Sequence, residues 1–200
     1  MTINQKQAKL KEIARPILDR QIDIAIAKTC QNPVPGEGNP DAELMFIGEA
    51  PGAQEDKLGR PFVGASGQFL GEMLETIGLK REDVFITNIV KFRPPNNRDP
   101  QPAEITACLP SLMAQIEAIG PKLVVFLGRH SLNVFFPELK ISQAHGQAVK
   151  KTLKYGTNQK LTQVFLPLYH PAAALYNGSM RTTLIEDFGK IPKILALIKN

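Results

Sequence analysis

The sequence predicts an α/β fold in which a mostly parallel sheet carries helices on both faces. Short apolar runs, which are typical of buried strands, alternate along the chain with segments whose apolar residues recur at helical spacing. The first three apolar runs lead to Gly48, Asn88 and Gly128, and a loop or a helix follows each of them. In such sheets the functional site lies at the carboxyl ends of the strands. We therefore expect the functional residues just after these three positions and after a fourth run that ends near His170.

Each element follows from the same patterns, taken in order along the chain. Near the amino end Leu10, Ile13 and Ile17 lie at helical spacing, and the Pro/Gly/Asn-rich segment 32–40 reads as a loop. Ser66 is placed to cap a helix. After the first loop we expect a strand over 43–48, a loop over 49–64, a helix from Ser66 through 77, a strand over 83–89, a loop over 91–102, a helix over 103–119, a strand over 123–127, a helix over 129–136, paired strands over 147–153 and 161–168 around a turn at 155–158, and a last helix over 182–198.

The composition limits the class of protein. Hydrophobic residues make up 43% and charged residues 22% of 200 residues, which is typical of a globular chain. We expect one domain over 1–200, with an N-terminal helix and loop over 1–35 and a core over 36–200. Lys and Arg number 24 against 19 Asp and Glu, and the net charge of +5 permits a polyanionic partner without proving one.

The length of the apolar runs and the number of cysteines limit the possible compartment and metal sites of the protein. No apolar run approaches the ~18 residues that a membrane span needs. Two cysteines are too few for a disulfide framework or a four-thiolate metal site. We therefore expect a cytoplasmic protein, with no membrane and no metal.

Three residues at the expected carboxyl edge point to a pocket for a flat ring. Phe62, between Pro61 and Gly64, could offer its ring face to a ligand, although the local pattern by itself favours a core phenylalanine under a loop. Asn88 offers both donors and an acceptor to a cyclic imide, or it caps a turn. His170, held by a following proline, could donate to an oxygen on which charge develops, or it is a structural histidine.

Taken together, these segments resemble the uracil-DNA glycosylase superfamily, and most closely its fourth family. GEAPG at 48–52 and GRPFVG at 59–64 are similar to that family's first motif. KFRPPNNR at 91–98 resembles its proline-rich loop, and HPAAAL at 170–175 resembles its second catalytic motif. The resemblance covers about 36–188 and implies a three-layer α/β/α sandwich around a central, mostly parallel sheet of four strands.

The resemblance also implies a monofunctional DNA repair enzyme that hydrolyses the N-glycosidic bond of deoxyuridine and leaves an abasic site. Phe62 would stack on uracil, Asn88 would bind its Watson–Crick edge, and His170 would donate to its O2. Glu49 would orient or activate water. Gly48 and Ala50 would line the uracil pocket. The partner would be uracil-containing DNA, single- or double-stranded, bound by a monomer.

DNA binding is expected to rest on phosphate contacts near the pocket. The candidates are Ser66 with the helix amides it precedes, Lys91, Arg93, Arg98 and Arg181. Any one of these cations is also explained as a solvated surface charge. Leu175 or Tyr176 would wedge into the gap that a flipped base leaves, although this family usually has leucine at 174 and arginine at 176, where this chain has Ala174 and Tyr176.

The chain departs from the fourth family at its iron–sulfur cluster. That family holds a [4Fe–4S] cluster on four cysteines, and only Cys108 stands where a ligand is expected, since Phe92 takes the third position and residues near 21 and 24 the first two. One thiolate cannot hold such a cluster, so we expect no cofactor. Phe92 would instead pack with three isoleucines, Ile22, Ile24 and Ile26.

Two other functions remain compatible with the sequence. One is a DNA-binding protein of the same fold without turnover, which would need a broken pocket. The other is a glycosylase for another damaged base such as hypoxanthine, which pocket size would decide.

Overall fold

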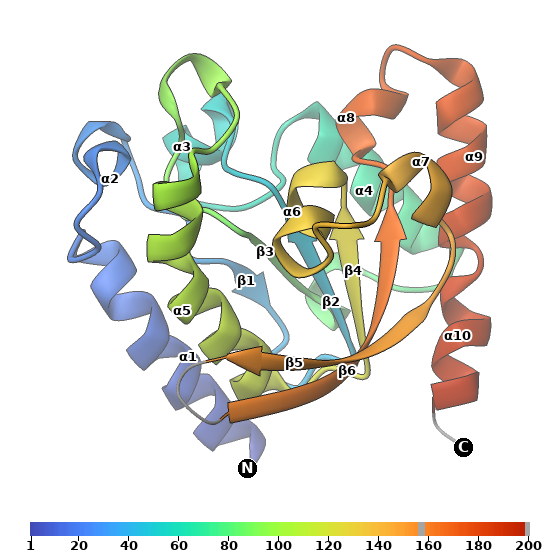
Figure 1. Ribbon diagram of the computed structural model, residues 1–200, viewed down its shortest axis with the longest axis horizontal. Helices are drawn as coiled ribbons and strands as arrows, with labels where there is room; N and C mark the ends of the chain where they lie inside the picture. Colours follow the sequence, from blue (N-terminus) through green and yellow to red (C-terminus); the bar gives the residue numbers. More distant parts are fainter. Residues whose placement is uncertain (156–158, 199–200) are drawn as a thin grey trace.

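The computed structural model describes residues 1–155 and 159–198 and has the predicted α/β architecture (Figure 1). Its sheet has six strands in the order β1-β3-β2-β4-β6-β5. The four central strands are parallel, and β1 and β5 add to the two edges in antiparallel pairing. The expected four-stranded sheet is thus the centre of a wider one. The strands are β1 (Glu37–Gly38), β2 (Leu44–Gly48), β3 (Phe85–Asn88), β4 (Leu123–Leu127), β5 (Val149–Tyr155) and β6 (Gln159–Leu168).

The helices differ from the expected ones in the last expected helix and in the loop expected over 49–64. The helices are α1 (Ile3–Leu18), α2 (Ala25–Thr29), α3 (Ala53–Leu58), α4 (Ala65–Thr76), α5 (Pro102–Ile119), α6 (Arg129–Phe135), α7 (Ile141–Ala144), α8 (Pro171–Ala174), α9 (Gly178–Phe188) and α10 (Ile191–Ile198), with 3₁₀ turns η1 (Arg81–Asp83) and η2 (Pro95–Asn97). The expected last helix is two helices. The first, α9, ends at Phe188 with Gly189 as its C-cap, and Pro192, which has no N–H, lies in the first turn of α10. The loop expected over 49–64 contains α3.

The start of α4 differs from the expected one, whereas the expected pair of antiparallel strands is confirmed. Ser66 does not cap α4, because the helix begins at Ala65 with Gly64 as its N-cap, and Ser66 lies within the first turn. The paired strands were correctly expected, as β5 and β6 pair antiparallel. The turn expected between them at 155–158 falls largely outside the described residues.

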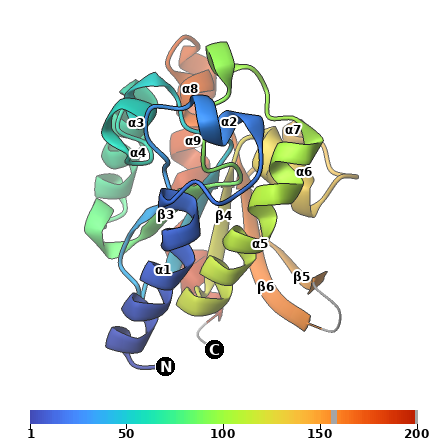
Figure 2. The same cartoon turned by 90° about the vertical axis from the view of Figure 1, so that its left-hand side faces the viewer.

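Both faces of the sheet are covered, which explains why the strands are continuous apolar runs. Alternate residues of one strand point to opposite faces, so Met45 and Ile47 enter one apolar cluster while Leu44 and Phe46 enter the other. The first cluster includes residues of α1, α5 and α6, and the second includes residues of α4, α9 and α10. Figure 2 shows α1 and α5 side by side over their face of the sheet.

The arrangement leaves the carboxyl edge of the sheet open to a site. In Figure 1 the parallel strands point to the top of the molecule, and the loops that follow β2 and β3 gather there.

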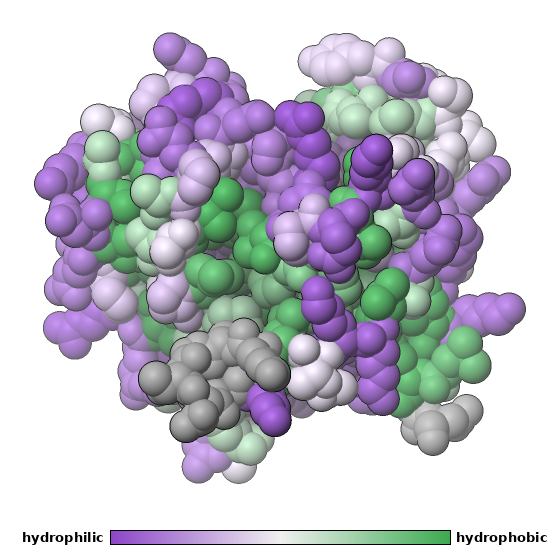
Figure 3. Space-filling model, viewed as in Figure 1, coloured by the Kyte–Doolittle hydropathy of each residue, from purple (hydrophilic) through white to green (hydrophobic). Residues whose placement is uncertain are grey.

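Figure 3 shows apolar side chains over α10 at the lower right, where Leu197 is 68% exposed. Among the described residues, no helix combines the length and apolar character that crossing a bilayer requires.

Candidate active site

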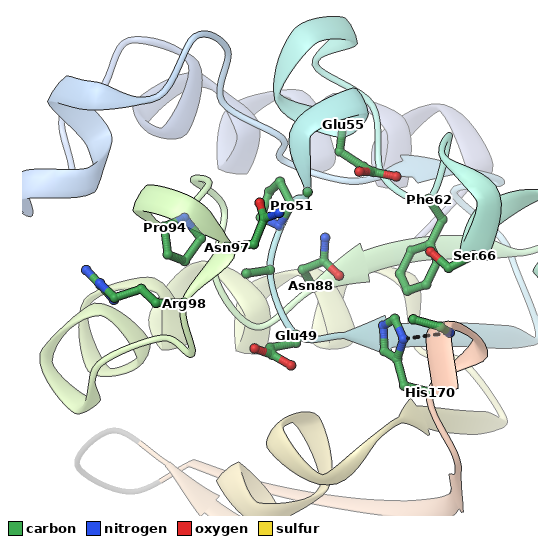
Figure 4. A pocket seen from close by; sticks show the side chains of 13 residues that line it. Glu49, Pro51, Glu55, Phe62, Ser66, Asn88, Pro94, Asn97, Arg98 and His170 are labelled. Carbon is green, nitrogen blue, oxygen red and sulfur yellow. Dashed lines mark hydrogen bonds between the residues drawn. The ribbon is translucent and has the colours of Figure 1, made fainter. Parts of the chain in front are cut away.

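A cavity of about 250 Å³ lies at the carboxyl edge of the sheet. Glu49, Phe62, Asn88 and His170 all line it, together with Ala50, although they come from separate segments of the chain (Figure 4). Parallel strands bring their carboxyl ends to one edge, so residues far apart in sequence meet there. The four residues singled out in the sequence therefore share one pocket.

Gly48, the last residue of β2, makes room for two of these side chains. It lies beside Asn88 in the β2–β3 pairing. A Cβ at position 48 would overlap Oδ1 of Asn88 and lie 2.6 Å from Cζ of Phe62. Glycine is therefore required because the Asn88 amide and the Phe62 ring both pack directly on this backbone.

Asn88 carries an unusual polar atom. The residue is 2% exposed, and its Oδ1 is buried without a hydrogen-bond partner among the described residues. Leaving a buried acceptor unpaired costs free energy, so native proteins rarely do so without a reason. The amide lies in the cavity between Glu49 and Phe62 in Figure 4, where an N–H of a ligand could pair with it.

Phe62 is held in a strained backbone conformation. Its φ is +51°, a left-handed value that a bulky residue seldom adopts. On one side of it, a carboxylate oxygen of Glu55 accepts hydrogen bonds from the backbone N–H groups of Val63 and Gly64, both at 2.9 Å. On the other side, Arg81 donates to the carbonyl of Phe62 at 2.8 Å and to that of Pro61. These bonds fix the ring direction before any ligand binds.

His170 is held as a neutral imidazole with one free N–H. Its Nδ1 accepts the backbone N–H of Ala172 at 3.1 Å, so the ring proton of the neutral form sits on Nε2. Burial lowers the pKa of His170 from 6.5 to about 4. The side chain is therefore an uncharged hydrogen-bond donor at neutral pH.

Glu49 faces the cavity from the end of β2, beside a second histidine. Its Oε2 lies 3.8 Å from Nε2 of His130, which in turn lies 3.3 Å from Oδ2 of Asp99. Burial raises the pKa of Glu49, and the charges of His130 and Arg129 work against that rise while Asp99 adds to it. His130 was unassigned from the sequence, because nothing there indicates that the start of α6 reaches the loop after β2.

Glu49, Asp99 and His130 form a group of side chains, among the described residues, whose spacing could hold a metal ion. One donor atom each of Glu49, Asp99 and His130 lie within 4.8 Å of one another. Arg129 also pairs with Asp99 at 3.1 Å, which places a cation beside the group. Exposed acidic groups reach such spacing without an ion, so we assign no metal to it.

The predicted DNA-contacting arginines make contacts within the protein. Arg98 lines the cavity and makes two hydrogen bonds to the carboxylate of Glu104, at 2.9 and 2.6 Å. Arg93 donates to Asn97 at 2.8 Å and is partly buried. Arg181 lies 4.0 Å over the ring of Phe69 and pairs with Glu72. Ser66 lines the cavity from the first turn of α4.

The structure contradicts the predicted contact between Lys91 and a DNA phosphate. Its side chain is fully buried, and its ammonium is bonded to Thr87, Asn88 and Gln115. It cannot reach a phosphate on the outside of the molecule. The sequence misled because a lysine in a Pro-rich loop normally points to solvent, whereas this loop folds back over β3.

The two candidate wedge residues differ in exposure. Leu175 packs partly buried against the apolar cluster of α4 and α9. Tyr176 is 95% exposed in the segment between α8 and α9. The Tyr176 side chain is therefore accessible to a binding partner, whereas the Leu175 side chain packs against the protein's own apolar cluster.

The cysteine pattern does not fit an iron–sulfur cluster. Cys30 and Cys108 are the two cysteines of the chain, both buried, and burial raises the pKa of both thiols, which disfavours the ligating thiolate. Such a cluster needs four ligands. In place of the missing ligands, one apolar cluster contains Phe92 and Ile26 with Ile22 and Ile24 packed against it. Apolar contacts thus join the N-terminal segment to the Pro-rich loop.

Several supporting residues were missed in the sequence. Glu55 and Arg81 hold the Phe62 segment, and Gly67 lets it approach α4, because a Cβ there would overlap the Phe62 carbonyl. Gln115 binds Lys91 from α5. These residues carry no local signal, since their importance comes from contacts between segments that are distant along the chain.

Comparison with known proteins agrees with the geometry. Residues 35–189 match the family model described as the uracil DNA glycosylase superfamily. The chain is 53% identical over 169 residues to a type-4 uracil-DNA glycosylase of Sulfurisphaera tokodaii, covering 82% of this chain and 74% of the relative. It is 46% identical over 191 residues to one of Archaeoglobus fulgidus, covering 92% of each. A type-5 uracil-DNA glycosylase of Thermus thermophilus is 40% identical over 90 residues, which are 38% of this chain and 41% of the relative.

Proposed function

The chain belongs to the uracil-DNA glycosylase superfamily, and on that premise we propose how its cavity removes uracil from DNA. The protein is a uracil-DNA glycosylase of the type-4 kind, a hydrolase of DNA repair. Its reaction hydrolyses the bond between C1′ of the sugar and N1 of uracil. The products are free uracil and an abasic site, the starting point of base excision repair.

Uracil is recognised by a ring and an amide. The target base leaves the duplex stack, since its glycosidic bond is hidden inside. The face of the extruded base then packs on Phe62, whose direction is fixed by Glu55 and Arg81. Asn88 accepts the N3–H of uracil at its unpartnered Oδ1 and donates to O4. Cytosine has no proton at N3 and an amino group at position 4, so it fails both bonds.

His170 stabilises the leaving group. As the C1′–N1 bond breaks, its electron pair passes to uracil, and negative charge develops on O2. The neutral imidazole donates Nε2–H to that oxygen, while Nδ1 stays bonded to Ala172. A donor aimed at a developing oxyanion is worth more in a buried site than in water.

Glu49 acts on the sugar side. The sugar becomes positively charged as uracil departs, and a nearby carboxylate stabilises that charge. Water then attacks C1′ and releases a proton toward Glu49. His130 and Arg129 favour the carboxylate form that this role needs. Gly48 and Ala50 shape the floor of the pocket beside it.

The reaction stops at the abasic site. Strand cleavage by a glycosylase of this kind needs a free amine that attacks C1′. Lys91 is the lysine of the motif segments, and its amine is buried in three hydrogen bonds. None of the residues lining the described cavity is lysine. The enzyme is therefore monofunctional.

DNA is held by cations and amides around the cavity mouth. The proposed phosphate contacts come from Arg98 and Arg93 in the Pro-rich loop, from Arg181, and from the first turn of α4 with Ser66. Tyr176, rather than the packed Leu175, would fill the gap left by the flipped base. The enzyme works as a monomer and without a cofactor in this proposal.

The observation that carries the proposal is the unpartnered Oδ1 of Asn88 in a cavity shared with Phe62 and His170. Oligonucleotides carrying U, T or hypoxanthine, single- and double-stranded, test it by alkali cleavage at the abasic site and gel analysis. Release of uracil alone supports the proposal. Tight DNA binding without release would favour a binding protein, and activity on hypoxanthine alone would favour another lesion.

A further inference from the structure

Lys91 has an environment that a surface cation does not have. Its side chain is fully buried, and Nζ donates to Thr87 Oγ1 at 2.6 Å, to the Asn88 carbonyl at 2.9 Å and to Gln115 Oε1 at 2.8 Å. An ammonium has three protons, so this set of acceptors is complete. All three described acceptors are neutral oxygens, and none is a carboxylate.

Burying such a group is expensive. Burial lowers the pKa of Lys91 to about 7, and Cys108 is the titratable group that faces it from α5. Replacing a complete buried ion pair by apolar side chains is often neutral or stabilising, so a buried charge is weak evidence of a role in stability. A buried ammonium with a complete shell therefore points to a requirement at this place other than stability.

The network converges on the residue that reads the base. Gln115 also donates to the Pro35 carbonyl at 2.7 Å, so it is itself held in place. Lys91 thus joins α5 and the 35–36 loop to the backbone of Asn88. Oδ1 of Asn88 has no hydrogen-bond partner among the described residues, so these residues do not orient the amide through that atom. Besides the packing of the amide on Gly48, fixing the Asn88 backbone is a way to aim it.

We propose that Lys91 is a positioning residue for uracil recognition, whose ammonium holds the Asn88 carbonyl so that the Asn88 amide meets the edge of the base. The proposal rests on the proposed function, since it needs Asn88 to read uracil. Lys91 itself touches neither substrate nor reacting atoms. A residue that only stabilises the fold would lower activity whether or not Asn88 were present.

A double-mutant cycle separates these two roles. The variants are Lys91→Met, Asn88→Ala and the double variant, assayed by single-turnover release of uracil at a temperature where circular dichroism shows each to be folded. Lys122→Met is the matched control, because it makes the same substitution in a lysine that pairs with Glu43 at the amino ends of the strands, away from the cavity. Loss of a hydrogen bond from a charged group predicts a rate about tenfold lower for Lys91→Met. The same change in the Asn88→Ala background should cost less than about twofold.

Other results would overturn the role. Equal losses in both backgrounds, or a Lys91→Met rate within about twofold of Lys122→Met, would show that Lys91 does not act through Asn88. If Lys91→Met does not fold, Gln115→Met, which removes one acceptor of the ammonium, replaces it in the same cycle with the same criteria. Wild type that releases no uracil would instead reject the proposed function, so the two failures are distinguishable.

Discussion

The rings of Phe62 and His170 lie with their centroids 5.6 Å apart and their planes 28° from parallel. A base sandwiched between two rings needs them roughly 7 Å apart, two layers of about 3.5 Å each. A base in this cavity must therefore lie against Phe62 with the imidazole at its edge. That arrangement places a hydrogen-bond donor, rather than a ring face, beside a carbonyl oxygen of the base.

We predict that His170→Ala slows single-turnover release of uracil by about a hundredfold or more, because a lost oxyanion donor costs ~2.7–4 kcal/mol. Rapid-quench kinetics with saturating enzyme would measure this directly. DNA binding should change little, since the donor acts mainly on charge that develops in the transition state. A rate close to that of wild type would remove His170 from the mechanism.

The acid limb of the pH–rate profile should report Glu49. Its pKa is raised above 4.5 by burial, so the carboxylate, and with it the rate, should be lost on acidification at a higher pH than an ordinary glutamate would give. His130→Gln removes a positive charge that favours the carboxylate, so we expect the acid limb to move to still higher pH. An unchanged limb in this variant would contradict the coupling. Lys28→Gln serves as the control, because it also removes a positive charge, but from an exposed pair with Asp23 on the surface.

Two glycines of α4 offer a matched test of the Phe62 conformation. A Cβ on Gly67 would overlap the carbonyl of Phe62, whereas a Cβ on Gly71 would meet nothing within 4 Å. Gly67→Ala should therefore destabilise the protein by about 1–3 kcal/mol and reduce uracil release. Gly71→Ala should be neutral or stabilising by up to about 1 kcal/mol, with normal activity. Chemical denaturation and the glycosylase assay give both quantities, and equal behaviour of the two variants would refute the argument.

Tyr176 should matter for duplex DNA more than for single strands. Its side chain is 95% exposed, and a wedge is useful only where a neighbouring base pair would otherwise close the gap. Tyr176→Ala should lower the rate on double-stranded substrate by about tenfold and on single-stranded substrate by less than about twofold. Comparison of the two substrates in one preparation is an internal control. Equal losses on both would exclude a wedge.

Purified protein should contain no iron–sulfur cluster. The chain has two cysteines, and Phe92 with Ile26 fills the apolar cluster near the Pro-rich loop. Iron analysis and visible absorption of protein isolated without oxygen measure this. Chelators should leave the thermal stability unchanged. Stoichiometric iron with cluster absorption would show that our assignment of the ligand positions is wrong.

The sequence determined the order of the central strands and of the longer helices, and it pointed to four of the residues that line the pocket. Its apolar runs end where the strands end, and the carboxyl ends of parallel strands meet at one edge, so Glu49, Asn88 and His170 were expected near one another. The flanking Pro61 and Gly64 also singled out Phe62, and the family resemblance then assigned a role to each of the four residues. These are consequences of local pattern and of a general rule for parallel sheets.

Only the tertiary structure decided which polar residues are buried and what they bind. Lys91 and Arg93 stand two residues apart in one loop, and the first is enclosed beneath Asn88 while the second is partly exposed. The strain at Phe62, the fit of Gly67 and the approach of His130 to Glu49 likewise depend on segments far apart in sequence. Burial and hydrogen bonding arise from the packing of the whole chain, and no window of neighbouring residues contains that information.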